Sequence, residues 1–270
     1  MIGHSESECQ GHRASLTPPK PVSYNGCLVD TANLSPKSDH IHRMFTAVPP
    51  RYDLINHIMT FGQDIRWRRL AAKACLEKKP QRVLDIGCGT GDLTITIARA
   101  AGKEVEVTGV DFSRPMLELA EKKAVDSGVG GKVKFVYGEA TSLPFPDGHF
   151  DCVGISFAFR NLTYKNPVKE KHLAEVVRVL KQNGRYVIVE SSQPSNRTIK
   201  TLFNLFLRGF VAPVGSLISN NRGAYRYLAE SVANFYSPPE VKDMLLKAGF
   251  SHVSYRPLVF GSAGIHIATK

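Results

Sequence analysis

The chain has 270 residues, of which 43% are hydrophobic and 22% charged, a balance typical of a globular protein with a sizeable core. Lysine and arginine outnumber aspartate and glutamate by 35 to 24, and the formal net charge of +11 favours anionic partners such as nucleic acid, acidic lipid or phosphate-bearing ligands. Its five cysteines lack metal-ligand spacing, which argues against a disulfide scaffold or a metal site and indicates a reducing compartment.

The chain divides at about residue 42. Residues 1–42 are rich in Ser, Pro, His and Gly without hydrophobic periodicity, which predicts a disordered tail. A helical pattern then runs to about residue 79 and ends in the basic segment DIRWRRLAAKACLEKK. We expect one domain over residues 43–270, with no helix that spans a membrane because no run of about 20 apolar residues is present.

Strand-like and helical patterns alternate after residue 80. The expected strands are 82–86, 105–112, 133–140, 150–157 and 185–192, with helices between them such as 114–128 and 167–181. This alternation predicts a parallel sheet with helices on both faces. Residues 253–261 and 264–270 predict an antiparallel hairpin at the C-terminus. The predicted fold is therefore α/β, a doubly wound, mostly parallel seven-stranded Rossmann-like sheet, with a helical lid inserted over 193–235.

The segment VLDIGCGTGDL joins the first strand to the first helix of this pattern. Gly87, Gly89 and Gly91 allow the backbone to approach a ligand closely, and Asp85 precedes them. Asp92 stands where a dinucleotide-binding fingerprint has its third glycine. Carboxylates at both ends of the loop suit an ammonium or sulfonium group better than a pyrophosphate. The loop thus predicts a site for S-adenosylmethionine rather than NAD.

Two further acids end strands of the same sheet. Asp111 ends the second strand, where a carboxylate can accept hydrogen bonds from both ribose hydroxyls. Glu139 and Ala140 are the last residues of the third expected strand, where a carboxylate can accept from the adenine amino group. The competing interpretation is a tight turn surrounded by chance acids. Acids at three successive strand ends favour the donor site.

Four separated segments carry a closer resemblance. In chain order, YDLINHIMTFGQDIRWRR, FAFRNLT, RVLKQNGR and YRYLAESV resemble the quinone C-methyltransferase family of menaquinone and ubiquinone biosynthesis, which lies within the class I S-adenosylmethionine-dependent methyltransferases. The resemblance covers about residues 43–270. It implies C-methylation of a demethylated polyprenyl quinol, with the naphthoquinol of menaquinone favoured and the benzoquinol of ubiquinone as the alternative. The family usually has Phe-Gly-Leu-Arg-Asn at 157–161, so Phe159 is bulkier than the usual leucine and changes the expected pocket shape.

Arg160 and Asn161 follow the fourth strand, which in this fold ends beside the donor's methyl group. A guanidinium stays charged and can stabilise a quinol phenolate, and Asn161 can hold the ring oxygen or a water. We predict these two residues as the catalytic pair, and the resemblance adds Tyr52. No dedicated base is evident. The alternative is that Arg160 pairs with an acid at the protein surface and Asn161 caps the next segment.

The predicted insertion is basic and aromatic. Between residues 191 and 229 it has no acid and five lysines or arginines. Lys200, Asn204 and Arg208 form one polar stripe of a helix, whereas phenylalanines lie on another face. A lid packed on the core and contact with a membrane surface are both compatible with this pattern. The predicted walls of the substrate pocket are Phe159, Phe203, Phe206, Tyr225 and Tyr227.

The expected partners are a polyprenyl quinol and the membrane surface, with a homodimer left open. The expected location is the cytoplasm, peripherally associated with the membrane. A methyltransferase for another small aromatic or lipid is a competing interpretation. An RNA-binding protein on the same fold is a second one, favoured by the net charge of +11. The insertion lacks Gly/Arg repeats and RNA-reading motifs, so no nucleic-acid partner is expected.

Overall fold

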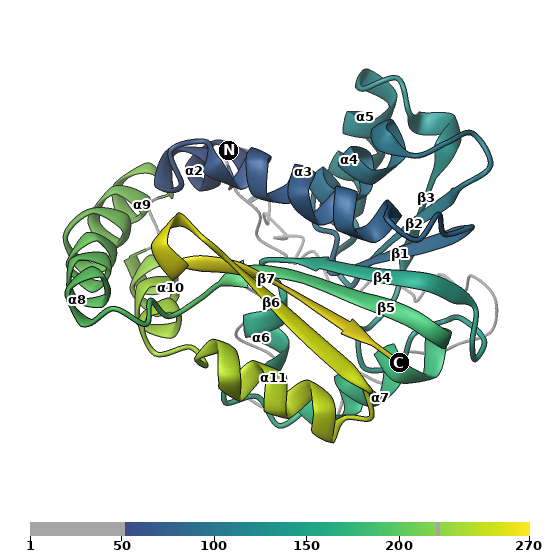
Figure 1. Ribbon diagram of the computed structural model, residues 1–270. Coiled ribbons are helices and arrows are strands. Elements are labelled where there is room, and N and C mark those ends of the chain that lie inside the picture. The colour runs from purple at the N-terminus through teal and green to yellow at the C-terminus, as the bar shows by residue number, and fades with distance from the viewer. Residues whose placement is uncertain (1–51, 220–221) are drawn as a thin grey trace, which may run out of the picture. The chain divides into compact units, whose positions relative to one another are not determined.

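The computed structural model describes residues 52–219 and 222–270 (Figure 1). The tail predicted for residues 1–42 lies outside these described residues, as does the side chain of Tyr52.

The strands of the described residues form one seven-stranded sheet in the order β3-β2-β1-β4-β5-β7-β6. The strands are β1 (Arg82–Ile86), β2 (Glu106–Asp111), β3 (Val133–Tyr137), β4 (Phe150–Ser156), β5 (Leu180–Ser191), β6 (His252–Leu258) and β7 (Ala263–Thr269). The first five are parallel to one another, and β7 pairs antiparallel with both β5 and β6. The predicted fold class and C-terminal hairpin are confirmed. Strand β5 begins earlier than expected, and its left-handed Asn183 (φ 63°) accompanies a register shift against β4.

Helices cover both faces of this sheet (Figure 1). On one face lie α3 (Gln63–Leu76), α4 (Asp92–Ala100) and α5 (Arg114–Asp126), and on the other α6 (Phe159–Thr163), α7 (Lys169–Val179) and α11 (Pro238–Lys247). Each face has its own apolar core. Along β5, Tyr186 and Ile188 belong to one core, and Val187 and Val189 belong to the other. This alternation explains why the central strands are apolar at nearly every position.

A run of helices between β5 and α11 forms a third, smaller core. It comprises α8 (Arg197–Phe206), a π-helical turn (Leu207–Val211), α9 (Ala212–Ser219) and α10 (Arg222–Ala233). Met59 of α2 (Tyr52–Met59) packs with Leu207, Val211 and Tyr225 in this core. A Cβ on Gly215 would lie 2.1 Å from the Tyr225 ring, so glycine permits the close approach of α9 and α10. Within the described residues, no helix has the length and apolarity needed to cross a membrane.

Candidate functional site

The glycine loop between β1 and α4 adopts backbone angles that favour glycine. Gly87, Gly89 and Gly91 have φ values of 62°, 54° and 82°. A Cβ on Gly91 would lie 3.0 Å from the Ala120 Cβ and 3.1 Å from the Phe135 ring, whereas one on Gly89 would meet nothing within 4 Å. Gly91 therefore permits close packing behind the loop. Gly89 leaves open space in front of it for a ligand.

Asp111 fastens this loop to the end of β2. Its carboxylate, only 8% exposed, accepts hydrogen bonds of 2.9 Å from the backbone N–H groups of Gly89 and Ser113. Burial raises the pKa of Asp111, the two hydrogen bonds oppose that rise, and the charge of Glu139 adds to it. The charge of Asp111 in turn helps to raise the pKa of Asp85. The three predicted acids are therefore close enough to interact at adjacent strand ends.

Asp85 carries a buried oxygen without a partner. Its Oδ2 accepts a 2.6 Å hydrogen bond from Thr94 Oγ1, but Oδ1 has no hydrogen-bond partner among the residues described. Burial is the main cause that raises the pKa of Asp85 to about 7. An unpaired buried carboxylate oxygen is costly unless a ligand satisfies it. An ammonium group at this position would supply both the hydrogen bond and the opposite charge.

A cavity of 470 Å³ extends from this loop to the helical insertion. The predicted site residues that line it are Asp85, Gly87, Gly89, Arg160, Asn161, Phe203, Phe206 and Tyr225. Four other predicted residues do not line the cavity, namely Gly91, Asp111, Glu139 and Ala140. Ala140 packs against the core on the sheet face that α6 and α7 cover. The cavity therefore joins the glycine loop, the Arg-Asn pair and the aromatic insertion in one space.

Two predicted pocket walls are corrected by the structure. Phe159 is fully buried and packs edge-to-face against Tyr186 and Phe235 in the core, so it does not line the cavity. Phe157 lines the cavity instead, with a left-handed φ of 57° that turns the chain at the end of β4. Tyr227 is half-buried on α10 and also lies outside the lining.

Arg160 lines the cavity and is 5% exposed. Its Nη1 donates to Ser231 Oγ at 2.6 Å and to Asn161 Oδ1 at 3.1 Å. Its Nε lies 3.9 Å from Glu190 Oε1 and has no hydrogen-bond partner within the described part of the chain. The interpretation of Arg160 as paired with a surface acid is therefore wrong, because the neighbouring acid is buried.

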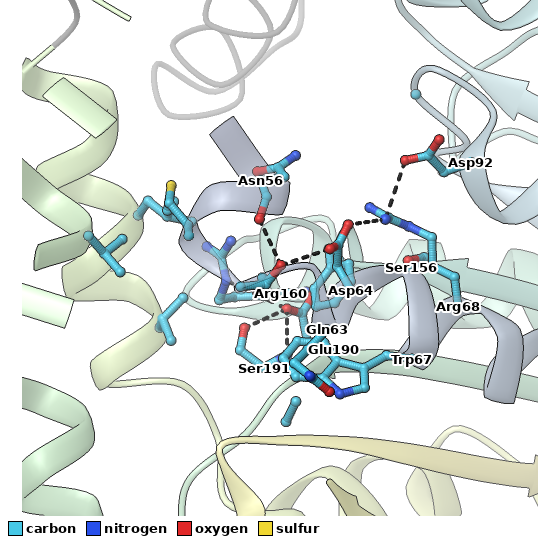
Figure 2. Close-up of a pocket in the computed structure, with 18 of the residues that line it drawn as sticks. Asn56, Gln63, Asp64, Trp67, Arg68, Asp92, Ser156, Arg160, Glu190 and Ser191 are labelled. Carbon is cyan, nitrogen blue, oxygen red and sulfur yellow. Dashed lines mark hydrogen bonds and ion pairs between the residues drawn. The ribbon is translucent and has the colours of Figure 1, made fainter. Parts of the chain in front are cut away.

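Glu190 is a site residue that the sequence reasoning missed. It is 3% exposed near the end of β5 and lines the cavity, as Asn161 does. Figure 2 shows it beside Arg160. It accepts hydrogen bonds from Arg160 N at 3.0 Å and from Ser191 N and Oγ at 2.9 and 2.7 Å. An acid at a strand end was the signal that identified Asp85. Applied to the segment VIVESS, the same signal finds Glu190.

Helix α3 adds to the cavity wall two more residues that the sequence did not reveal as site residues, Asp64 and Arg68. Asp64 is 1% exposed and accepts from Arg68 Nη1 at 2.5 Å, and Arg68 also pairs with Asp92 at 3.3 Å (Figure 2). Thr60 Oγ1 donates to Asp64 at 2.8 Å, and His57 Nδ1 lies 2.7 Å from it. Burial acts to raise the pKa of Asp64, but the contacts from Thr60 and Arg68 lower it overall. The spacing of Asp64 and Arg68, four residues apart, indicates a helical ion pair but not its place in a cavity.

Polar contacts connect α2 to the glycine loop. Lys123 Nζ pairs with Asp53 of α2 at 2.7 Å and with Asp92 of α4. Thr90 Oγ1 donates to Asp53 Oδ1 at 2.8 Å. The helix that precedes the sheet is therefore joined to the loop through charged and hydroxyl groups.

The cavity has a charged end and an apolar end. Its described lining includes five acids and two arginines, namely Asp53, Asp64, Asp85, Asp92, Glu190, Arg68 and Arg160. The insertion contributes an apolar wall, including Phe203, Leu207 and Val211. Such a cavity suits a ligand with a cationic group at one end and a second, greasy ligand at the other. Among the described residues, no group of three His, Cys, Asp or Glu side chains is placed to hold a metal ion.

Solved structures with the same fold include methyltransferases at low sequence identity. The structure of an O-methyltransferase family protein from Burkholderia thailandensis matches with a TM-score of 0.60 at 13% identity, covering 85% of this chain and 62% of that one. A structure described as a putative O-methyltransferase from Nostoc punctiforme matches with a TM-score of 0.59 at 20% identity, covering 83% and 62%. These likenesses show the fold.

Relatives found by sequence have higher identity to this chain than these solved structures have. A demethylmenaquinone methyltransferase from Thermus thermophilus is 45% identical over 84% of this chain and 100% of its own length. A protein of the same name from Thermotoga maritima is 40% identical over 84% of this chain and 95% of its own length. A ubiquinone/menaquinone biosynthesis C-methyltransferase from Pseudomonas savastanoi is 36% identical over 87% and 91%. The model of the ubiE/COQ5 methyltransferase family matches residues 33–270, and the chain belongs to that family.

Proposed function

We propose that the protein transfers a methyl group from S-adenosylmethionine to a ring carbon of a demethylated polyprenyl quinol, with the naphthoquinol as its substrate. The observation that carries this proposal is the single cavity that connects the glycine loop, Arg160 and the apolar insertion. The relatives at 40–45% identity are named for demethylmenaquinone, which favours the naphthoquinol.

The glycine-loop end fits the methyl donor. The unpaired Oδ1 of Asp85 is available to the ammonium group, and Gly89 leaves space for close approach. Asp111 accepts hydrogen bonds from the backbone of Gly89, Ser113 and Phe112, so of the roughly four acceptor directions of its carboxylate one remains for a ribose hydroxyl. Glu139, near Asp111, is assigned to the adenine. When bound, S-adenosylmethionine supplies an electrophilic methyl group on its sulfonium.

Arg160 is assigned to the acceptor. A quinol ring carbon becomes nucleophilic when the neighbouring hydroxyl loses its proton, and a guanidinium can stabilise the resulting phenolate. The unpaired Nε of Arg160 is a donor available for that oxygen. In a buried site one placed donor of this kind is worth about 3–4 kcal/mol. Asn161, held by Arg160, and Tyr52 complete the proposed set.

The insertion is assigned to the polyprenyl tail and the bilayer surface. Phe203, Phe206 and Tyr225 give the cavity an aromatic wall. On the outer side of α8, Leu202 and Leu205 are 60% and 67% exposed. Exposed apolar side chains beside basic ones favour an anionic membrane surface, from which a tailed substrate can enter without crossing water.

A second candidate substrate is the benzoquinol. The relatives from Pseudomonas are named for both ubiquinone and menaquinone biosynthesis and are 35–36% identical. The same cavity and Arg160 would serve either ring, because both quinols ionise at a hydroxyl next to the carbon that is methylated.

The test is transfer of labelled methyl from S-adenosylmethionine to short-chain quinols, with demethylmenaquinol and the demethylated benzoquinol assayed side by side. With dithionite present we expect C-methylation of the naphthoquinol, and almost none of the oxidised quinone, whose carbonyls withdraw electron density from the ring. The product should retain both exchangeable hydroxyl protons. Equal rates on the oxidised form, or an ether product, would contradict the proposal.

A further inference from the structure

We propose that Glu190 is the general base that takes the hydroxyl proton from the bound quinol. This inference rests on the proposed function and deepens it. Ionisation of the hydroxyl requires a proton acceptor within hydrogen-bond reach of the ring oxygen. Glu190 is a buried carboxylate that lines the cavity next to Arg160, the residue assigned to that oxygen (Figure 2).

The position of Glu190 follows from the sheet. Strands β4 and β5 are parallel neighbours, with Ser156 in register with Val189. The segment after β4 and the last residues of β5 therefore meet at the same edge. Glu190 Oε2 accepts from the Arg160 backbone N–H at 3.0 Å, which fixes the carboxylate beside the start of α6. The two groups that would handle the ring oxygen thus come from adjacent strand ends.

The hydrogen bonds of Glu190 leave it able to accept a proton. Among the described residues, its donors are two backbone N–H groups and the Ser191 hydroxyl. Its guanidinium neighbour stands at 3.9 Å, beyond hydrogen-bond distance. Glu190 Oε1 takes both hydrogen bonds from Ser191, whereas Oε2 takes only the one from the Arg160 N–H, so an acceptor direction on Oε2 remains for a quinol hydroxyl.

The other acids in the cavity lining are committed elsewhere. Asp64 bonds directly to Arg68, and its lowered pKa makes it a weaker base. Asp53 and Asp92 both pair with Lys123. Asp85 belongs to the glycine loop assigned to the donor. Among the described lining residues, Glu190 is the acid that lies next to Arg160 and Asn161. Its nearest ion-pair contact, to the Arg160 Nε, is 3.9 Å long.

The groups around Glu190 are few and identifiable. Arg160 faces it from α6, and Ser231 of α10 contacts that guanidinium. Tyr186 lies on the same strand, and burial, with the charge of Glu190 added, raises the Tyr186 pKa well above its usual value. Across the sheet Glu190 pairs with Gly264, which brings no charge. The charge balance at the ring oxygen is thus set mainly by Glu190 and Arg160.

Proton transfer from the quinol to Glu190 comes before the carbon–carbon bond forms. The quinol O–H bond breaks, its proton moves to a Glu190 oxygen, and the electron pair stays on the ring oxygen beside Arg160. The adjacent ring carbon forms a bond to the methyl carbon while the methyl–sulfur bond breaks, its pair remaining on sulfur, and the ring oxygen becomes a carbonyl. The hydrogen on that ring carbon then leaves to water, its pair restores the aromatic ring, and Glu190 returns its proton to the oxygen. One proton is released per turnover.

The test is the pH profile of kcat with dithionite-reduced short-chain demethylmenaquinol. Glu190→Gln should lose about 100-fold or more at pH 7, the scale of general base catalysis. Its rate should then rise about tenfold per pH unit towards pH 9.5, as solution ionisation of the quinol replaces the base, whereas the wild type stays nearly flat. Formate should restore part of the rate in Glu190→Ala. A loss that is constant with pH and insensitive to formate would leave Glu190 a merely structural role.

Controls separate the possible failures. Glu230→Gln, an exposed acid on α10, should keep the wild-type rate and profile. Calorimetry with S-adenosylmethionine checks that the Glu190 variants are folded, and Glu190→Asp keeps the carboxylate with a shorter reach. Glu190→Asp should show a reduced rate and a flat profile; a rate that rises with pH as steeply as that of Glu190→Gln overturns the inference. A wild type that methylates neither quinol overturns the proposed function, whereas an active wild type with a fully active Glu190→Gln overturns only the role of Glu190.

Discussion

The two ends of the cavity are built differently. The glycine-loop end is formed by consecutive strand ends of one parallel sheet, and backbone hydrogen bonds to Asp111 hold it in place. The opposite end is formed by side chains from α2, the π-helical turn and α10, segments far apart in the sequence. The first end therefore depends on backbone geometry and charge, and the second on the packing of apolar side chains. Substitutions should separate these dependences.

Loss of Asp111 should have the largest effect on the donor end. Asp111→Ala removes the acceptor of the Gly89 N–H group and the proposed ribose contact. We expect weaker binding of S-adenosylmethionine by about 1.5–3 kcal/mol, the scale of hydrogen bonds to a charged group. Calorimetry measures this directly. Unchanged affinity would remove Asp111 from the donor site.

Arg160→Lys should instead spare donor binding and slow methyl transfer by about tenfold or more. Lysine keeps the charge but cannot donate to Ser231, Asn161 and the ring oxygen in one plane. Calorimetry with the donor and single-turnover rates together distinguish the two ends. A variant with wild-type turnover would show that the guanidinium is only structural.

Donor affinity should depend on pH through Asp85. Its pKa is raised to about 7, and the ammonium group binds the ionised form, so affinity should be full above pH 7 and fall as the pH drops through 7. Between pH 7.5 and 6 the expected loss is about eightfold for one such group. Asp85→Asn should bind weakly at every pH, without that dependence. The same slope in this variant would assign the titration to another group.

The positive charge on α8 should affect only the binding of the protein to a membrane surface. Lys200 is exposed, and Lys200→Gln should weaken co-sedimentation with anionic liposomes by about 1 kcal/mol. Lys103→Gln, which removes an exposed charge from the loop before β2, is the matched control and should bind as the wild type does. Equal binding by both variants would mean that α8 presents an ordinary solvated face.

Phe159→Leu should have the smallest effect on catalysis. The side chain lies in the core, so we expect a loss of stability of about 1 kcal/mol and nearly unchanged kinetic constants. Thermal unfolding and the methyl-transfer assay check both. A marked change in quinol KM with unchanged stability would return Phe159 to the pocket wall.

The sequence predicted the glycine-loop end well because its signals are local. The bounds of β1 are those expected, and Asp85 and Asp111 lie at strand ends as their positions in the pattern indicate. The other end was predicted in part. The left-handed φ of Phe157, which turns Phe159 into the core, has no signal in a residue that is not glycine. The cavity positions of Asp64 and Arg68 depend on how α3 packs on the sheet, which the helical period alone does not determine.

The separate core of the insertion has an evolutionary consequence. Leu207, Val211 and Tyr225 pack with one another and with Met59, apart from the two cores that hold the sheet. Effects of substitutions in clusters that share no partners are close to additive. Mutation can therefore reshape the apolar wall without weakening the strands that carry the glycine loop. A lineage could exchange one acceptor ring or tail for another while inheriting an unaltered glycine loop, the proposed methyl-donor site.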